Sequence, residues 1–222
     1  MEFEAIIFDL DDTLIDRNHA VTELFKLFYS KYYLNNNLYD VDTMMKDFIN
    51  LDKKYYGKDE KDKIFKNFIL KYPLNQAINL ENISHFWNNN FPQCFKPDKK
   101  VKQLLDILSR SYKIALITNG TSMRQRQKLV NSNLEKYFEV VIISDEVSVS
   151  KPDVEIFQKA LNKLKLPPEK CLYVGDHLIN DIQGIQQAGL KSCWYNPNDI
   201  KNKTDVIPDL VINNLQELYF NK

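Results

Sequence analysis

The stretch IIFDLDDTLID, residues 6–16, places three carboxylates directly behind an apolar run. The apolar residues predict a buried strand, and Asp9, Asp11 and Asp12 follow it at once. Like charges this close together repel one another, and burying any of them without a partner is costly. In an extended chain the side chains of Asp9 and Asp11 point the same way. The stretch therefore fits either a surface turn, which Asp and Thr favour, or a site for a cation.

The second half of the chain indicates how this first strand is used. From about residue 97 onward, helix-period segments alternate with apolar runs such as YKIALIT (112–118), EVVIIS (139–144) and CLYVGD (171–176). Such strands are typical of a parallel sheet covered by helices on both faces. Helices are predicted over 101–110, 124–138, 152–164 and 179–190, the third with Pro152 in its first turn.

Between these segments and the first strand lies a block with helical periodicity only. Val21, Leu24, Phe25 and Phe28, for example, recur at the spacing of one helix face. The sequence therefore predicts an α/β protein with a Rossmann-like parallel sheet and an inserted α-helical domain. We expect residues 1–15 and 96–222 to form the α/β core and residues 16–95 to form the helical domain, with most of its aromatic residues in its interior.

Polar residues also stand at the ends of three later strands, where ligands of such sheets bind. LITNG ends with Thr118 and Asn119, which fit either an ordinary Asn-Gly turn or an oxyanion site built from a hydroxyl and backbone N–H groups. Lys151 in VSKPD precedes a helix, where a positive charge is mildly unfavourable unless an anion lies there too. In YVGDHLINDI, Asp176 ends a strand and Asp181 follows, and Asp176 could equally cap the next helix.

The ordered set DxDxT, strand-end Thr, Lys and GDxxxxD resembles the motifs of the haloacid dehalogenase-like superfamily. The resemblance covers the whole α/β part, and the helical block after the first motif looks like the inserted cap of that family. It implies that Asp9 is a nucleophile and that Asp11 is a general acid and base. It also implies that Thr118, Asn119 and Lys151 bind phosphate.

The resemblance further implies a Mg²⁺ cofactor. Asp176 matches the acidic metal ligand, and Asp181 matches an acid that orients Lys151 or a metal-bound water. Because Mg²⁺ prefers hard oxygen ligands and keeps several waters, Asp9, the backbone carbonyl of Asp11, and Asp176 are expected to suffice. The implied reaction is hydrolysis of a phosphomonoester through an aspartyl-phosphate at Asp9.

Single positions in the first motif distinguish the different activities of the family. Its dehalogenases and phosphonate hydrolases lack the second Asp of the first motif, which is present here as Asp11, and its sugar phosphomutases carry Gly where Asp12 stands. This favours a phosphatase, with a phosphomutase or a non-catalytic phosphate-binding protein as alternatives. The form GDHLINDI is similar to that of pyrimidine 5'-nucleotidases and N-acylneuraminate-9-phosphatases. A nucleoside monophosphate or a sugar phosphate is therefore the expected partner.

Composition limits the remaining classes. Among 222 residues, 30 Lys and Arg balance 30 Asp and Glu, which argues against a nucleic-acid or membrane-surface protein. Three cysteines without paired spacing indicate free thiols in a reducing compartment, and we expect a cytoplasmic protein. The sequence does not indicate an oligomeric state. Arg17, His19 and His177 lie next to motif positions and fit either a pocket mouth or a solvated surface.

Overall fold

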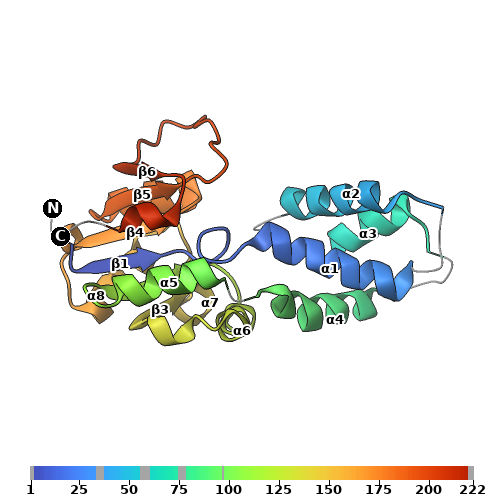
Figure 1. Ribbon diagram of the computed structural model, residues 1–222, viewed down its shortest axis with the longest axis horizontal. Helices are drawn as coiled ribbons and strands as arrows, with labels where there is room; N and C mark the ends of the chain where they lie inside the picture. The colour runs from blue at the N-terminus through green and yellow to red at the C-terminus, as the bar shows by residue number, and fades with distance from the viewer. Residues whose placement is uncertain (1–2, 34–37, 56–60, 75–78, 97, 220–222) are drawn as a thin grey trace. The chain divides into compact units, whose positions relative to one another are not determined.

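The computed structural model describes residues 3–33, 38–55, 61–74, 79–96 and 98–219 (Figure 1). The chain divides into two compact units. The core unit comprises Met1–Asp16 and Pro97–Lys222, and the helical unit comprises Arg17–Lys96.

The core unit is built on one sheet, in which the described strands all run parallel in the order β3-β2-β1-β4-β5-β6. This confirms the predicted α/β fold with a parallel sheet. From β1 the chain winds outward through β2 to β3, and then crosses back to β4 on the other side of β1. The carboxyl ends of β1 and β4 are thus the switch point at which such sheets bind ligands. The strands are β1 (Ala5–Phe8), β2 (Lys113–Thr118), β3 (Val140–Ile143), β4 (Cys171–Gly175), β5 (Lys191–Tyr195) and β6 (Leu210–Ile212).

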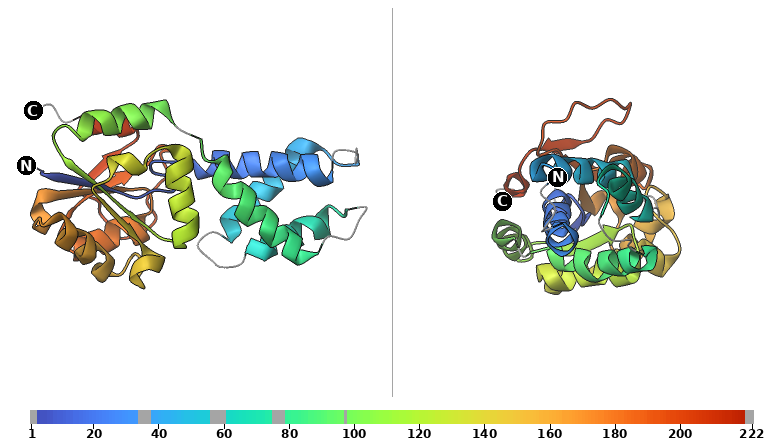
Figure 2. Two further views of the ribbon diagram at one scale, coloured as in Figure 1. Left: turned by 90° about the horizontal axis from the view of Figure 1, so that it is seen from below. Right: turned by 90° about the vertical axis from the view of Figure 1, so that its right-hand side faces the viewer.

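Helices cover both faces of this sheet (Figure 2). On one face, Ile7 and Ala115 share a buried cluster with Phe157 of α8 and Ile185 of α9. Ile6, the neighbour of Ile7, is also fully buried and points to the other face because side chains alternate along a strand. The helices of this unit are α5 (Lys99–Leu108), α6 (Ser122–Ser132), α7 (Ser144–Val147), α8 (Val154–Leu164) and α9 (Gly184–Gln187), with 3₁₀ turns at Glu135–Tyr137, Pro168–Lys170 and Leu215–Leu218.

Three predicted helices of the core unit differ from the observed ones. The helix predicted over 124–138 ends at Ser132, because Asn133 adopts the left-handed conformation with φ 55°. Pro152 lies before α8 and not in its first turn, since Asp153 is the N-cap and accepts a hydrogen bond from the backbone N of Glu155. The segment predicted over 179–190 begins as a π-helical turn, Leu178–Gln183, before α9.

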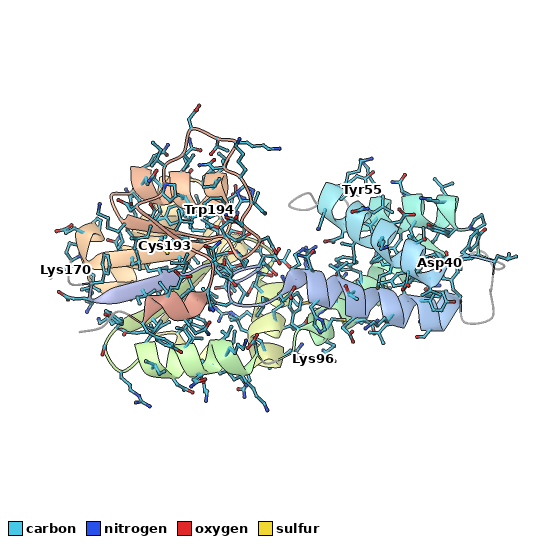
Figure 3. All side chains as sticks on the ribbon, turned by 45° about the horizontal axis from the view of Figure 1, so that its top comes forward. Asp40, Tyr55, Lys96, Lys170, Cys193 and Trp194 are labelled. Atoms are coloured by element: carbon cyan, nitrogen blue, oxygen red, sulfur yellow. The ribbon has the colours of Figure 1, made fainter. Side chains whose placement is uncertain are left out.

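The helical unit contains α1 (Arg17–Tyr32), α2 (Val41–Lys54), α3 (Lys61–Lys71), α4 (Leu80–Asn90) and a 3₁₀ turn, Phe91–Cys94. Its interior is aromatic, as predicted: Phe28 of α1 packs edge-on against Phe65 with ring centroids 4.9 Å apart. Asp40 and Tyr55 mark the two ends of α2 (Figure 3). None of the helices in the described part of the chain is long and apolar enough to cross a membrane.

Candidate active site

Parallel pairing brings the motif residues to one edge of the sheet. Phe8, the last residue of β1, lies in register with Leu116 of β2 and Val174 of β4. Asp9 follows Phe8 directly, and its backbone N donates to the carbonyl of Val174 at 2.9 Å. Thr118 ends β2 and Asp176 follows β4. The polar strand ends that the sequence singled out therefore belong to one site.

Lys151 is the positive centre of this site. Its Nζ lies 2.6 Å from Oδ1 of Asp9, 2.7 Å from Oδ1 of Asp181 and 3.0 Å from the hydroxyl of Tyr173. An ammonium group has three hydrogens to donate, and these three acceptors match them. Lys151 is only 5% exposed. Its orientation is thus fixed by protein groups on three sides.

Three carboxylates lie close together at this site. Oxygens of Asp9, Asp176 and Asp181 all lie within 4.8 Å of one another. Burial raises the pKa of Asp9 to about 7 although the charge of Lys151 opposes this, and the nearby Asp181 carboxylate raises it further. Burial also raises the pKa of Asp176 to about 9, with Asp9 and Asp181 adding to the effect. One ammonium does not balance the three acids, and their hard oxygen atoms suit a divalent cation such as Mg²⁺.

A glycine, a hydroxyl group and a turn residue shape the surroundings of the three carboxylates. A Cβ at Gly175 would lie 2.5 Å from Oδ2 of Asp181, so only glycine lets that carboxylate approach the strand end. The hydroxyl of Thr13 donates to Oδ1 of Asp176 at 3.3 Å, and the backbone carbonyl of Asp176 accepts from the indole of Trp194 at 2.8 Å. Asp12 has φ 59°, a conformation that Asp tolerates, and it turns the chain after the first motif. Thr13 thus contacts the side chain of Asp176, and Asp12 forms the turn after the first motif.

The side chain of Asn119 fixes the segment that carries Lys151. Its Nδ2 donates to the carbonyl of Lys151 at 3.0 Å, and its Oδ1 accepts from the backbone N of Lys151 at 2.9 Å. Both polar atoms of the amide are therefore engaged by backbone. Because an amide NH₂ group carries two hydrogens, Asn119 could contact phosphate through the second hydrogen of Nδ2 or through its backbone N–H.

Two residues of α6 that the sequence did not single out contact the first motif. Nζ of Lys128 lies 2.7 Å from each carboxylate oxygen of Asp11. Nε2 of Gln125 donates to Oδ2 of Asp11 at 3.1 Å and to Oγ1 of Thr118 at 2.5 Å. The available signal was their spacing of three residues, which places both on one face of a predicted helix. On a helix rich in Arg, Gln and Lys that signal does not stand out.

The residues next to the motifs have structural partners within their own units. Arg17 is 5% exposed, and its Nη2 lies 2.6 Å from Oδ1 of Asp52, with its guanidinium 5.0 Å from the ring centre of Phe91. Nδ1 of His177 accepts from the backbone N of Asn180 and caps the π-helical turn. His19 lies on the exposed face of α1.

Comparison with known proteins places this arrangement in a family. A sequence model of the haloacid dehalogenase-like hydrolases matches residues 6–195. The glyceraldehyde 3-phosphate phosphatase of Pyrococcus furiosus is 30% identical over 194 residues, which cover 86% of this chain and 80% of that protein. The pyrimidine 5'-nucleotidase PynA of Streptococcus pneumoniae is 27% identical over an alignment of 236 residues, which covers 98% of this chain and 94% of that protein.

The fold has a close counterpart among solved structures. The magnesium-bound structure of YfnB from Bacillus subtilis superposes with a TM-score of 0.82, covering 99% of this chain and 98% of that one at 24% identity. The family match spans both the first strand and β5, and the relatives align over most of their length. The chain belongs to the haloacid dehalogenase-like hydrolase family.

Proposed function

We propose that this protein is a Mg²⁺-dependent phosphatase that hydrolyses a small phosphomonoester through an aspartyl-phosphate at Asp9. The observation that carries the proposal is the contact between the Asp9 carboxylate and the Lys151 ammonium, beside Asp176 and Asp181. A carboxylate held against a buried cation can meet a phosphate dianion that it would otherwise repel. The same group is a known nucleophile in phosphoryl transfer.

The acidic group supports the cofactor assignment. Asp9, Asp176 and the backbone carbonyl of Asp11 would hold Mg²⁺, which when bound supplies positive charge to the phosphoryl group. Asp181 accepts hydrogen bonds from Lys151, from the Tyr173 hydroxyl and from the backbone N of His177. Its proposed role is to fix Lys151.

The chain's own residues account for both halves of the reaction. A carboxylate oxygen of Asp9 forms a bond to phosphorus while the bond from phosphorus to the ester oxygen breaks. Asp11 gives a proton to that oxygen, so that an alcohol leaves. A water molecule then attacks phosphorus and gives a proton to Asp11, and the bond from Asp9 to phosphorus breaks to release inorganic phosphate.

The phosphate group would be held at the ends of β2 and of the segment before α8. Lys151 supplies charge, Thr118 a hydroxyl, and Asn119 a backbone N–H. Thr118 is 1% exposed and its Oγ1 already accepts from Gln125, so its hydroxyl hydrogen is directed elsewhere and can be donated to an anion. Fixed donors that require no rearrangement stabilise transition-state charge most effectively.

We propose a nucleoside monophosphate or a sugar phosphate as substrate, and the cytoplasm as the place of action. The form of the fourth motif supports the substrate class, as do relatives named for a pyrimidine nucleotide and for a triose phosphate. The three cysteines are buried free thiols, which supports a reducing compartment.

The proposal is tested with p-nitrophenyl phosphate, a panel of phosphorylated metabolites, and the variant Asp9→Asn. Turnover should require Mg²⁺, stop with EDTA, and fall to background in the variant, because an amide is not a carboxylate nucleophile. The matched control is Asp153→Asn, an exposed N-cap position where Asn serves as well as Asp. Activity of a tenth or more in purified Asp9→Asn protein, with deamidation excluded by mass spectrometry, would refute the assignment.

A further inference from the structure

We infer that Lys128 and Gln125 of α6 are positioning residues that hold the Asp11 carboxyl group in place for both proton transfers. The inference rests on the proposed function, because it assigns a role in that same reaction. It starts from two buried polar side chains that no motif of the sequence includes. Lys128 is 5% exposed and Gln125 is 2% exposed.

The contacts with Asp11 come from two residues that are three positions apart in α6. The ammonium of Lys128 lies 2.7 Å from both carboxylate oxygens, and the amide of Gln125 lies 3.1 Å from Oδ2. Hydrogen bonds between an ammonium and a carboxylate are among the stronger ones in proteins. A carboxylate contacted at both oxygens by one donor, and at one oxygen by another, cannot rotate about its last torsion without losing a contact.

Gln125 also links the acid to the phosphate-binding position. The same Nε2 that reaches Asp11 donates to Oγ1 of Thr118 at 2.5 Å. One amide thus sets the separation between the group that moves the proton and a group that binds the phosphate. Its place is itself fixed, since its side chain packs against Gly120, where an added Cβ would lie 3.2 Å from it.

Position matters here because Asp11 acts twice on different atoms. It must reach the ester oxygen in the first half of the reaction and the attacking water in the second. Misplacing a catalytic group by about 1 Å can cost roughly 100-fold in rate. Removing the Lys128 ammonium should therefore damage the proton-transfer steps selectively, whereas a purely structural role of the ion pair would affect every step alike.

The test compares Lys128→Met with Asp11→Asn on two leaving groups. p-Nitrophenolate leaves without a proton, whereas an alkoxide leaving group needs one. Loss of the proton transfer by Asp11 should therefore slow single-turnover cleavage of an alkyl phosphate far more than it slows the burst of p-nitrophenol. Lys128→Met should show the same pattern, with an alkyl phosphate cleaved on the order of 10–100-fold more slowly and KM nearly unchanged. Lys113→Met, which removes an ammonium at the amino end of β2, is the matched control.

The double variant Asp11→Asn, Lys128→Met gives the sharper readout. If Lys128 acts through Asp11, its removal costs nothing further once Asp11 is Asn, and the two losses are not additive. The double variant also removes both charges of the buried pair, so it keeps the test available if Lys128→Met alone folds poorly. Gln125→Met should reproduce the selective loss in milder form, with a higher KM through Thr118.

Two results would overturn the inference, and they are distinguishable from each other. The positioning role alone would be refuted if the wild-type protein is active and the rate losses of Asp11→Asn and Lys128→Met are additive. Equal slowing of both leaving groups in Lys128→Met would refute it as well. Wild-type protein without phosphatase activity on the whole panel would refute the proposed function and this inference with it.

Discussion

The ammonium of Lys151 lies 2.6 Å from the carboxylate Oδ1 of Asp9, and both groups are more than nine-tenths buried. The two residues come from opposite halves of the core sequence and meet because β1 occupies the centre of the sheet. The pair is held by Asp181 and by the hydroxyl of Tyr173, which donates to Asp181 at 2.9 Å. Asp9, the proposed nucleophile, therefore depends on Lys151 and also on Asp181 and Tyr173, which hold Lys151.

Tyr173→Phe tests this dependence with the removal of one oxygen atom. The ring remains to fill the core, while Lys151 and Asp181 each lose a partner. Two net hydrogen bonds of about 1 kcal/mol each predict a decrease in kcat/KM of roughly 5–30-fold. Steady-state kinetics on p-nitrophenyl phosphate measures it, and Tyr137→Phe, in the turn before the amino end of β3, is the control. Unchanged kinetics in Tyr173→Phe would show that Lys151 is held without this hydroxyl.

Arg17→Met tests whether Arg17 has a structural role. The change leaves the Asp52 carboxylate buried without its guanidinium partner at 2.6 Å, which should cost about 3–5 kcal/mol in free energy of unfolding. Asp52→Asn in the same chain should recover much of the loss. Urea denaturation followed by circular dichroism measures both. Wild-type stability in Arg17→Met, together with a raised KM, would instead assign Arg17 to substrate binding.

The cysteines should resist thiol reagents in the folded protein. Burial raises the pKa of Cys94 and Cys171 to about 11 each and that of Cys193 to about 12. Because the thiolate is the reactive form, little of it is present at neutral or mildly alkaline pH, and access is restricted as well. Titration with a chromogenic disulfide should detect almost no thiol in native protein and all three after denaturation. Rapid reaction of a native thiol would contradict the described burial.

The fold was predictable from the sequence because its strands are apolar, short and separated by helices. The meeting of the acidic and basic residues at the strand ends could also be predicted, because parallel strands place their carboxyl ends at one edge of the sheet. Gln125 and Lys128 could not be predicted, because Asp11, the partner that they share, lies more than 100 residues away in the sequence. A polar helix face also has no feature that distinguishes buried from solvated positions. The contacts of the Tyr173 hydroxyl could not be predicted either, because packing alone explains a buried aromatic residue in a strand.

The start of α8 shows a second kind of limit. Pro152 and Asp153 are both favourable near a helix N-terminus, and the sequence does not say which residue takes which position. The observed N-cap is Asp153, which accepts from the N of Glu155 at 2.9 Å. Such a difference moves the helix boundary by two residues, yet it leaves Lys151 outside the helix with its side chain in the site.

Trapping the proposed covalent intermediate tests the nucleophilic role that we assign to Asp9. Asp11→Asn keeps the shape and the backbone carbonyl of the first motif but removes the carboxyl group that we propose as acid and base. General acid–base catalysis contributes roughly 10²–10⁴-fold. With p-nitrophenyl phosphate the first step should survive, because the leaving group needs no proton, whereas hydrolysis of the aspartyl-phosphate should be slow because the attacking water has lost its base.

The measurement is mass spectrometry of acid-quenched Asp11→Asn protein after mixing with p-nitrophenyl phosphate and Mg²⁺. We expect the burst of p-nitrophenol to be matched by one phosphoryl group on the peptide that carries Asp9, and we expect hydroxylamine to remove that group. Asp9→Asn, added to the same variant, should abolish both the burst and the label. A burst with no phosphoryl group on that peptide, or with the group on another residue, would show that Asp9 is not the nucleophile.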